Sequence, residues 1–391
     1  MTHLLLAVIY IAFVSLGLPD AILGAAWPTM YPQFGVSVSY MGILSFIISG
    51  GTVLSSLNAH RLTKRFGTGV VTAASVALTA LALLGFSWSN SFWMLALWAI
   101  PYGLGAGAVD ASINNYVAIH YASRHMSWLH CMWGVGACTG PYVMGYVLAG
   151  GASWGTSYRY IGIFQVVLSL ILISSLPLWK RGTGEQKAQK TPRTMREILA
   201  TPGVREILVG FFCYCALEAT AGQWASSYFV MKDGVSPEEA ASLASLFYIG
   251  MTVGRAVSGF LTIRFSDKQM IRLGQAGIGM GIAVMLLPLG RTGTVIGLVL
   301  AGLGCAPIYP CIIHSTPDHF VEENSQGVIG LQMAGAYTGS LTMPPLFGLL
   351  ADFVGAELLP AYLLVILVLM VLMVERLNRI GAGKSRRVKN N

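Results

Sequence analysis

The chain has 391 residues, of which 55% are apolar and 10% are charged, whereas about a quarter of the residues in an average soluble domain are charged. So little polar surface cannot cover a large globule in water, and the composition therefore excludes a soluble protein in favour of one that lies mainly in lipid. The net charge of +8 does not indicate nucleic-acid binding, because the basic residues stand in short segments between apolar blocks.

Twelve apolar blocks are long enough to cross a bilayer as helices, since about 20 apolar residues span its hydrocarbon core. The first block predicts a retained helix, because it is too long for a signal peptide and has neither a basic flank nor a cleavage-type site. The expected spans are residues 4–31, 39–58, 69–88, 91–119, 126–149, 158–179, 204–230, 239–262, 270–290, 294–316, 326–351 and 358–377.

The basic residues predict the side of the membrane on which each loop lies. Arg159, Lys232 and Arg291 follow odd-numbered spans and Arg255 lies inside a span, whereas all other Lys and Arg lie at the opposite ends, in the central polar stretch or in the tail. Because cytoplasmic loops are enriched in Lys and Arg, both termini are expected in the cytoplasm of a bacterial-type inner membrane. Residues 180–203 are then a cytoplasmic linker, and residues 379–391 are a basic cytoplasmic tail.

The two halves of the chain resemble each other at an offset of 199 residues. The pairs at this offset are LTKRF at 62–66 with LTIRF at 261–265, GLG at 103–105 with GLG at 302–304, and GACTG at 136–140 with GAYTG at 335–339. At an offset of 198, DAILG at 20–24 corresponds to EATAG at 218–222. Four pairs in order predict two similar six-helix bundles, at residues 1–179 and 204–378.

These two halves, together with the segments GLPDAILGAAWPTMYPQFG, YGLGAGAVDASINNYV and LHCMWGVGACTGP, resemble the major facilitator superfamily and its fucose-permease-like branch of sugar and cation symporters. The resemblance covers nearly the whole chain. It implies an all-α membrane protein with twelve transmembrane helices in two pseudo-symmetric bundles, which transports by alternating access to a midplane site. One motif departs from the family, because Lys64 in KRFG stands where the loop after the second span usually carries Asp.

Three acidic residues, Asp20, Asp110 and Glu218, lie inside predicted spans. An ionised carboxylate that faces lipid at the bilayer centre costs about 2.5–3.5 kcal/mol. We therefore expect all three to face an aqueous cleft between the halves, where a partly desolvated carboxyl can carry a proton. For Asp20 and Asp110 the resemblance implies the same role, since acidic residues in the first and fourth spans of the family serve cation coupling and sugar recognition. The alternative for each is an interhelical hydrogen bond that only fixes packing.

Sugar binding requires aromatic faces for the ring and amide or acid groups for the hydroxyls. The residues expected to bind substrate are Trp27, Asp110, Asn114, Asn115, His130, Trp133, Gln223, Trp224, Tyr309 and Gln332. For most of them packing is the alternative, although Tyr309 is placed between Pro307 and Pro310, which are expected to break the tenth helix. The residues expected to gate the pathway are Arg65, Arg255 and Arg264, and for Arg255 a gate or a snorkelling anchor explains the position at least as well as a contact with substrate.

These features predict a symporter that imports a neutral monosaccharide or polyol with a proton, or alternatively with sodium. We expect a monomer in the lipid bilayer that binds a small-molecule substrate, without cofactor, metal site, nucleic-acid partner or enzymatic activity. GLGAGA at 103–108 and NRIGAGKS at 378–385 only approximate nucleotide-binding motifs. A proton-linked drug antiporter stays open, because GACTGPYVMG at 136–145 approximates a motif of such exporters. A receptor or scaffold that has kept the fold and lost transport is a further alternative.

Overall fold

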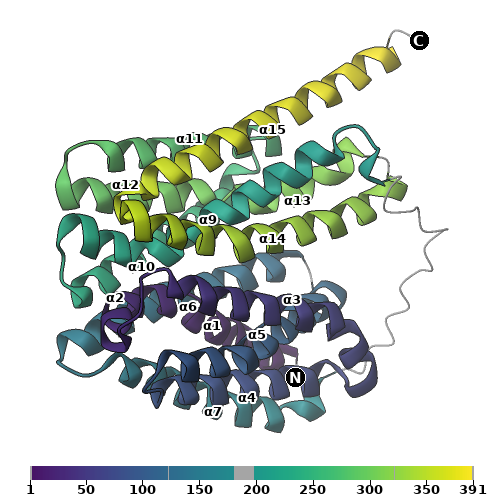
Figure 1. The fold of residues 1–391 in the computed structure, drawn as a ribbon. Coiled ribbons are helices and arrows are strands. Elements are labelled where there is room, and N and C mark those ends of the chain that lie inside the picture. The colour runs from purple at the N-terminus through teal and green to yellow at the C-terminus, as the bar shows by residue number, and fades with distance from the viewer. Residues whose placement is uncertain (1, 122, 180–197, 321, 390–391) are drawn as a thin grey trace. The chain divides into compact units, whose positions relative to one another are not determined.

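The structure is a computed structural model that describes residues 2–121, 123–179, 198–320 and 322–389. All regular elements in these ranges are helices, which confirms the expected all-α class (Figure 1). The helices are α1 Thr2–Asp20, α2 Ile22–Phe34, α3 Tyr40–Phe66, α4 Thr68–Ser87, α5 Phe92–His120, α6 Ser123–Ala149, α7 Trp154–Ser174, η1 Leu176–Leu178, α9 Val204–Asp233, α10 Pro237–Leu261, α11 Asp267–Leu286, α12 Gly290–Cys305, α13 Ile308–His319, α14 Glu322–Val354, η2 Ala356–Leu358 and α15 Leu359–Lys389.

Each predicted span lies on one helix or on one pair of consecutive helices. The first span comprises α1 and α2, which meet at Ala21, and the tenth comprises α12 and α13. The break in the tenth span is the one that its prolines predict, since α12 ends at Cys305 and Pro307 caps α13. A proline provides no N–H for the helical hydrogen bond and its ring crowds the preceding turn. The chain is therefore free to change direction directly beside Tyr309.

Eight helical segments in the described part of the chain are long and apolar enough to cross a membrane, by length and composition. Helices α6, α9, α11 and α14 fall below that hydropathy standard. In α9 the polar side chains of Thr220, Ser226 and Ser227 are fully buried, so they face protein instead of lipid. Six of the predicted site residues lie on these helices, so polar residues that a site would require weaken the membrane signal of the helices that carry them. They are His130, Trp133, Glu218, Gln223, Trp224 and Gln332.

The chain divides into two compact units. Unit 1 comprises Met1–Gly184, Gly222–Ile249 and Pro345–Glu357, and unit 2 comprises Glu185–Ala221, Gly250–Pro344 and Leu358–Asn391. The first unit thus contains the N-terminal bundle together with parts of α9, α10 and α14. Because this division follows packing and not chain order, the expected halves stay a prediction. Most of the expected linker, residues 180–197, lies outside the described residues.

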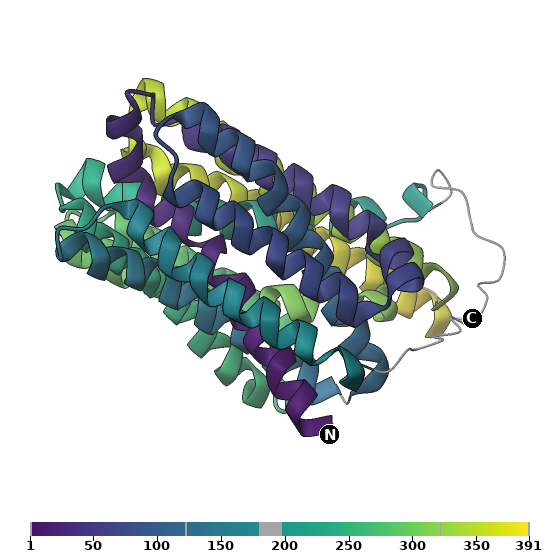
Figure 2. The ribbon, with the colours of Figure 1, turned by 90° about the horizontal axis from the view of Figure 1, so that it is seen from below.

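Glycines set the close helix contacts of the N-terminal bundle. Helix α1 packs on α6, and α3, α5, α4 and α7 pack on one another in that order (Figures 1 and 2). A Cβ atom on Gly136 would overlap the Val14 carbonyl, and one on Gly140 would overlap the Leu18 carbonyl, so α6 lies directly against the α1 backbone. On α5, Gly103 and Gly107 face the carbonyls of α3 in the same way.

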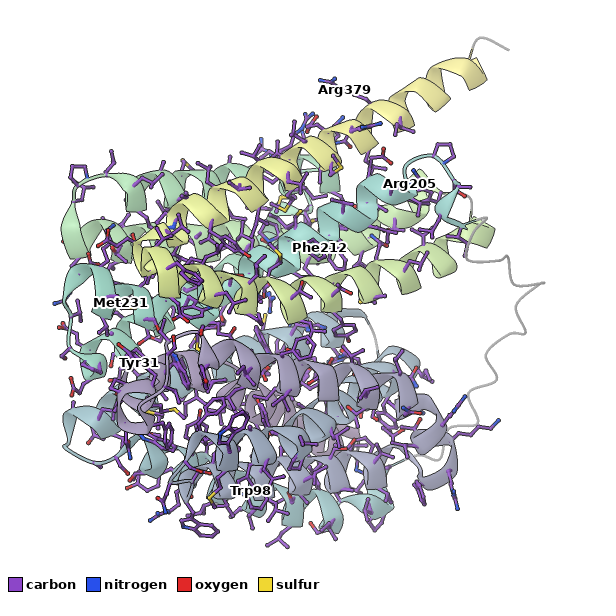
Figure 3. The ribbon with its side chains drawn as sticks, in the orientation of Figure 1. Tyr31, Trp98, Arg205, Phe212, Met231 and Arg379 are labelled. Atoms are coloured by element: carbon purple, nitrogen blue, oxygen red, sulfur yellow. The ribbon has the colours of Figure 1, made fainter. Side chains whose placement is uncertain are left out.

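The repeat in the sequence recurs as a repeat in packing inside unit 2. Gly339, the counterpart of Gly140 at an offset of 199, faces the backbone carbonyl of Phe212 on α9, a residue labelled in Figure 3. Gly250, the counterpart of Gly51, faces a carbonyl of α12, as Gly51 faces α5. The paired glycines therefore allow the same close approach of helix backbones in both halves. This is a physical reason for the similarity of the segments that contain them.

The last helix extends beyond the expected span. We expect a basic tail from residue 379, whereas α15 continues as a helix to Lys389. Lys and Arg have high helix propensity and no proline interrupts the segment, so the backbone can continue its hydrogen-bonding pattern past the apolar stretch. Arg379, at the start of this extension, is exposed and points away from α15 (Figure 3).

Candidate functional site

Asp20, the last residue of α1, is held by two neutral donors of unit 1. Trp133 Nε1 on α6 donates to Asp20 Oδ2 at 2.8 Å, and the Tyr102 hydroxyl on α5 donates to Asp20 Oδ1 at 3.1 Å. Gly17, one turn before Asp20, allows this contact because the α6 backbone at Trp133 occupies the place of a Cβ atom. Asp20 is nevertheless exposed. Its carboxyl group is thus positioned by two donors on a residue that keeps some exposure.

Asp110 is the second acidic residue of unit 1 and lies on α5. Asn114, one turn further on, donates its Nδ2 to Asp110 Oδ1 at 2.9 Å and to the Asp110 backbone oxygen at 3.1 Å. Asp20 acts electrostatically on Asp110, so the two carboxyl groups lie in one neighbourhood. In the described part of the chain, neither Asp20 nor Asp110 forms an ion pair. Two like charges are therefore brought together with only neutral hydrogen-bond donors.

Glu218 on α9 belongs to unit 2 and has a cationic partner. Its Oε1 lies 3.8 Å from NH2 of Arg255 on α10, and the two side chains are only 19% and 16% exposed. Tyr214, one turn before Glu218, is fully buried and donates to the Cys305 carbonyl at 3.1 Å. Because the guanidinium balances the carboxylate, this cluster carries no net charge, in contrast to the two aspartates of unit 1.

Tyr309 joins the cluster around Glu218 from the start of α13. Its ring lies 5.0 Å from the ring of Phe211 and 6.2 Å from that of Tyr214, and its hydroxyl donates to the sulfur of Met333 at 3.5 Å. Gln332, also in unit 2, is fully buried and accepts a hydrogen bond from Thr316 at 3.0 Å. The structure thus places Tyr309 against Tyr214, the residue one turn before Glu218, and gives Gln332 a buried partner between α13 and α14.

On α6, Trp133 and His130 lie one turn apart. The Trp133 ring contacts Tyr248 edge to face, with 6.4 Å between the ring centroids, in addition to its bond with Asp20. The His130 ring contacts Phe13 edge to face at 5.9 Å. On α5, Asn115 is exposed beside Asn114. Trp133 is therefore the predicted aromatic residue that the structure brings into direct contact with a predicted carboxylate.

Trp27 and Trp224 are fully buried in unit 1. The Trp27 indole donates to the Val38 carbonyl at 2.8 Å, and the Trp224 ring packs edge to face on Phe347 at 5.0 Å. Gln223 donates to the Ser45 hydroxyl. These contacts are structural ones in the conformation described, so a role of these three residues in substrate binding stays a prediction.

The arginines expected to gate the pathway are not equivalent. Arg65, at the end of α3, is exposed and lies 5.2 Å from the centroid of the Phe66 ring. Arg264, in the turn after α10, is also exposed. Only Arg255 contacts another of the predicted site residues in the described part of the chain. Gating by any of the three stays a prediction.

Two tyrosines at these sites, Tyr214 and Tyr102, are not among the residues predicted from the sequence, although a signal for one of them was present. Tyr214 precedes Glu218 by one helical turn, and this spacing alone places the two side chains on one face. Tyr102 has no such signal, because it is 82 residues from Asp20 and on another helix. Only the packing of α1 against α5 brings it to the carboxylate.

The comparisons with known proteins agree with this architecture. The family model for the Major Facilitator Superfamily matches residues 9–234 and 207–389. The chain is 26% identical over 290 residues to Bypass of stop codon protein 6 of Saccharomyces cerevisiae, which covers 66% of this chain and 57% of that protein. It is 21% identical over 354 residues to the glucose/mannose transporter GlcP of Bacillus subtilis, which covers 87% of this chain and 86% of GlcP.

A solved structure supports the same fold. The crystal structure of a mutant of the nucleoside transporter NupG matches with a TM-score of 0.78 at 10% identity, and the match covers 95% of this chain and 98% of that one. An identity this low shows the fold alone. Together with the family match over nearly the whole chain, it confirms the resemblance read from the sequence motifs: the protein belongs to the Major Facilitator Superfamily.

Proposed function

We propose that this transporter moves a neutral sugar or a related polyol together with a proton, and that Asp20 and Asp110 bind the proton. The observation that carries the proposal is the environment of Asp20. Two neutral groups donate to its carboxyl group, although the residue as a whole is exposed. Since these donors bring no positive charge, a proton is the cation that balances the carboxylate when the site closes.

The proximity of Asp110 strengthens this assignment. Asp20 acts electrostatically on Asp110, and protonation of either carboxylate relieves the repulsion between the two. Uptake of a proton therefore reduces the net charge of the region. A neutral substrate then binds beside a site whose charge has been lowered, and this lowers the electrostatic cost of closing the loaded site off from water.

Glu218 has a different role in the proposal. Its partner Arg255 already balances its charge at 3.8 Å, so the C-terminal cluster needs no proton for neutrality. We assign substrate positioning to Glu218 and Arg255, and proton coupling to the two aspartates alone. This narrows the expectation from sequence that all three acidic residues couple.

The substrate class follows from the groups that the site offers. Asp110 and Asn114 provide acceptor oxygens for hydroxyl groups, and Trp133 provides an aromatic face. The similarity to GlcP, named as a glucose/mannose transporter, supports a sugar. In this proposal the protein transports by the alternating access of its superfamily, in which substrate and coupling ion bind in one region near the bilayer midplane.

Uptake into proteoliposomes tests the proposal. With a pH gradient imposed, the wild-type protein accumulates labelled glucose or mannose, whereas Asp20→Asn and Asp110→Asn retain exchange across the membrane without accumulation. Glu357→Gln, which changes an exposed acidic residue, serves as the matched control and accumulates normally. Normal accumulation by both aspartate variants would rule out proton coupling at this site.

The same vesicles separate the alternatives. Accumulation that requires a sodium gradient and ignores the pH gradient would assign sodium as the coupling ion. Extrusion of lipophilic cations, with no effect of any sugar on the melting temperature, would identify a drug antiporter. Absence of exchange across a panel of sugars, amino acids and drugs, with folded protein verified, would favour the receptor or scaffold.

A further inference from the structure

Helix α1 presents one face to α6 over ten residues. Four residues spaced by three, four and three positions lie on this face: Tyr10, Phe13, Gly17 and Asp20. The residues of α6 that contact them follow in the same order: His125, His130 and Trp133. The contact between α1 and α6, here called the α1–α6 seam, therefore carries a row of polar side chains from Asp20 to the start of α6.

The far end of this row is a hydrogen bond between two titratable groups. The Tyr10 hydroxyl and His125 Nδ1 lie 2.9 Å apart, and both residues are half-buried. An unprotonated Nδ1 accepts from the hydroxyl, whereas the N–H of an imidazolium donates to the hydroxyl oxygen, so the bond persists in both protonation states. His125 can thus gain and lose a proton without losing this partner.

His130 lies between this pair and Asp20. The ten residues from Tyr10 to Asp20 span about 15 Å of helix, which is too far for direct transfer of a proton. The His130 ring contacts Phe13, with 5.9 Å between the ring centroids, and Phe13 lies between Tyr10 and Asp20 on the same face of α1. Histidine is the side chain that most readily gains and loses a proton near neutral pH. His130 thereby divides the distance into two shorter steps.

We propose that His130 and the His125–Tyr10 pair carry the proton from Asp20 to the side on which α6 begins, which the sequence predicts to be the cytoplasm. The carboxylic acid O–H of Asp20 breaks and an N–H forms on His130. The imidazolium then passes its proton to His125, which releases it to bulk water, and each group returns to its starting state. Water bridges the steps, because both histidines are only half-buried.

Other polar side chains surround the seam. The titratable ones that contact or act on its members, directly or through one ring, are Tyr102, Asp110, Tyr116, His120 and Tyr121. Helix α7 faces α1 with the neutral Gln165, whose amide donates to the Ser15 carbonyl at 2.7 Å. His120 belongs to α5, where its Nδ1 donates to the Tyr116 carbonyl at 3.0 Å and its ring stacks on the Tyr116 ring. His120 is therefore a matched control of the same residue type.

The inference rests on the proposed binding of a proton by Asp20 and adds the route by which that proton leaves. Exchange of sugar for sugar requires no release of the proton, whereas net transport requires Asp20 to lose its proton in every cycle. Loss of the route should therefore slow net transport and spare exchange. The number of protons moved with each sugar should stay unchanged, because Asp20 is still present.

Downhill flux of labelled glucose in proteoliposomes tests the route, with equal pH on both sides and the potential held at zero by potassium and valinomycin. We expect His130→Ala and His125→Ala to lower net flux about tenfold relative to exchange, because each removes a proton carrier. Imidazole on both sides should restore net flux by carrying the proton across the gap. His120→Ala should keep the flux of the wild-type protein, with no effect of imidazole.

The outcomes separate the route from the site that it serves. Undiminished net flux in both alanine variants, or a loss that imidazole does not restore, would overturn the route and leave proton binding by Asp20 intact. Absence of glucose-driven proton uptake in the wild-type protein, followed by a pH-sensitive dye without imidazole, would overturn the proposed function as well. His130→Gln and His125→Gln, which keep a hydrogen-bonding group but carry no proton, replace alanine variants that do not fold and must slow net flux equally.

Discussion

Removal of Arg255 should destabilise the protein more than removal of both members of its ion pair. Arg255→Leu leaves the Glu218 carboxylate, only 19% exposed, without its partner at 3.8 Å. Breaking a buried pair at one end costs about 3–5 kcal/mol. Because both side chains keep some contact with solvent, we expect a value near the lower limit, about 3 kcal/mol, which corresponds to a fall of several degrees in melting temperature.

Thermal unfolding of the purified protein measures this effect, with the double variant Glu218→Gln and Arg255→Leu as the control. The double variant removes both charges, so it should recover most of the loss, with a coupling energy of about 2 kcal/mol between the two sites. Equal losses for Arg255→Leu and for the double variant would refute the assignment. That result would mean that Arg255 contributes through packing and not through the charge of Glu218.

Three further variants test the packing and the site. Gly136→Ala should destabilise the protein by about 1–3 kcal/mol through overpacking. Gly50→Ala, where a Cβ atom meets open space, should stabilise the protein by about 0.5–1 kcal/mol, and thermal unfolding compares the two variants. Trp133→Phe keeps an aromatic ring but loses the 2.8 Å bond to Asp20, and should lower gradient-driven accumulation while exchange persists. Trp27→Phe should cost about 1–3 kcal/mol of stability without changing transport per folded molecule; a changed substrate affinity would restore Trp27 to the binding site.

The sequence predicts the helices well, because the information is local. Blocks of apolar residues specify the spans, and all twelve lie on helices. The paired glycines also follow from the sequence, since Gly140 and Gly339 occupy equivalent positions and each faces a backbone carbonyl of the first helix of its half, Leu18 in one case and Phe212 in the other. The proline-dependent break beside Tyr309 is a local property too.

Partners from distant segments do not follow from the sequence in the same way. The hydropathy of the first span indicates that a carboxylate at position 20 is unusual. It does not indicate that Tyr102 and Trp133 donate hydrogen bonds to it from two other helices. Likewise the sequence gives no reason to separate Glu218 from the two aspartates. What separates them is the position of Arg255, which depends on how α9 and α10 pack.

The internal repeat explains why that difference matters. At an offset of 199, Arg255 corresponds to Ser56 and Tyr309 to Asp110, while Glu218 corresponds to Asp20 at an offset of 198. The C-terminal half thus combines an acid, a cation and a phenol, whereas the N-terminal half combines two acids and a hydroxyl that donates to the Gly107 carbonyl. One set is neutral as it stands, and the other reaches neutrality only by taking up cations. If both halves share one architecture, the proposed mechanism predicts that the residue at position 56 or 255 determines which half takes up a proton, and it assigns different roles to Asp20 and Glu218.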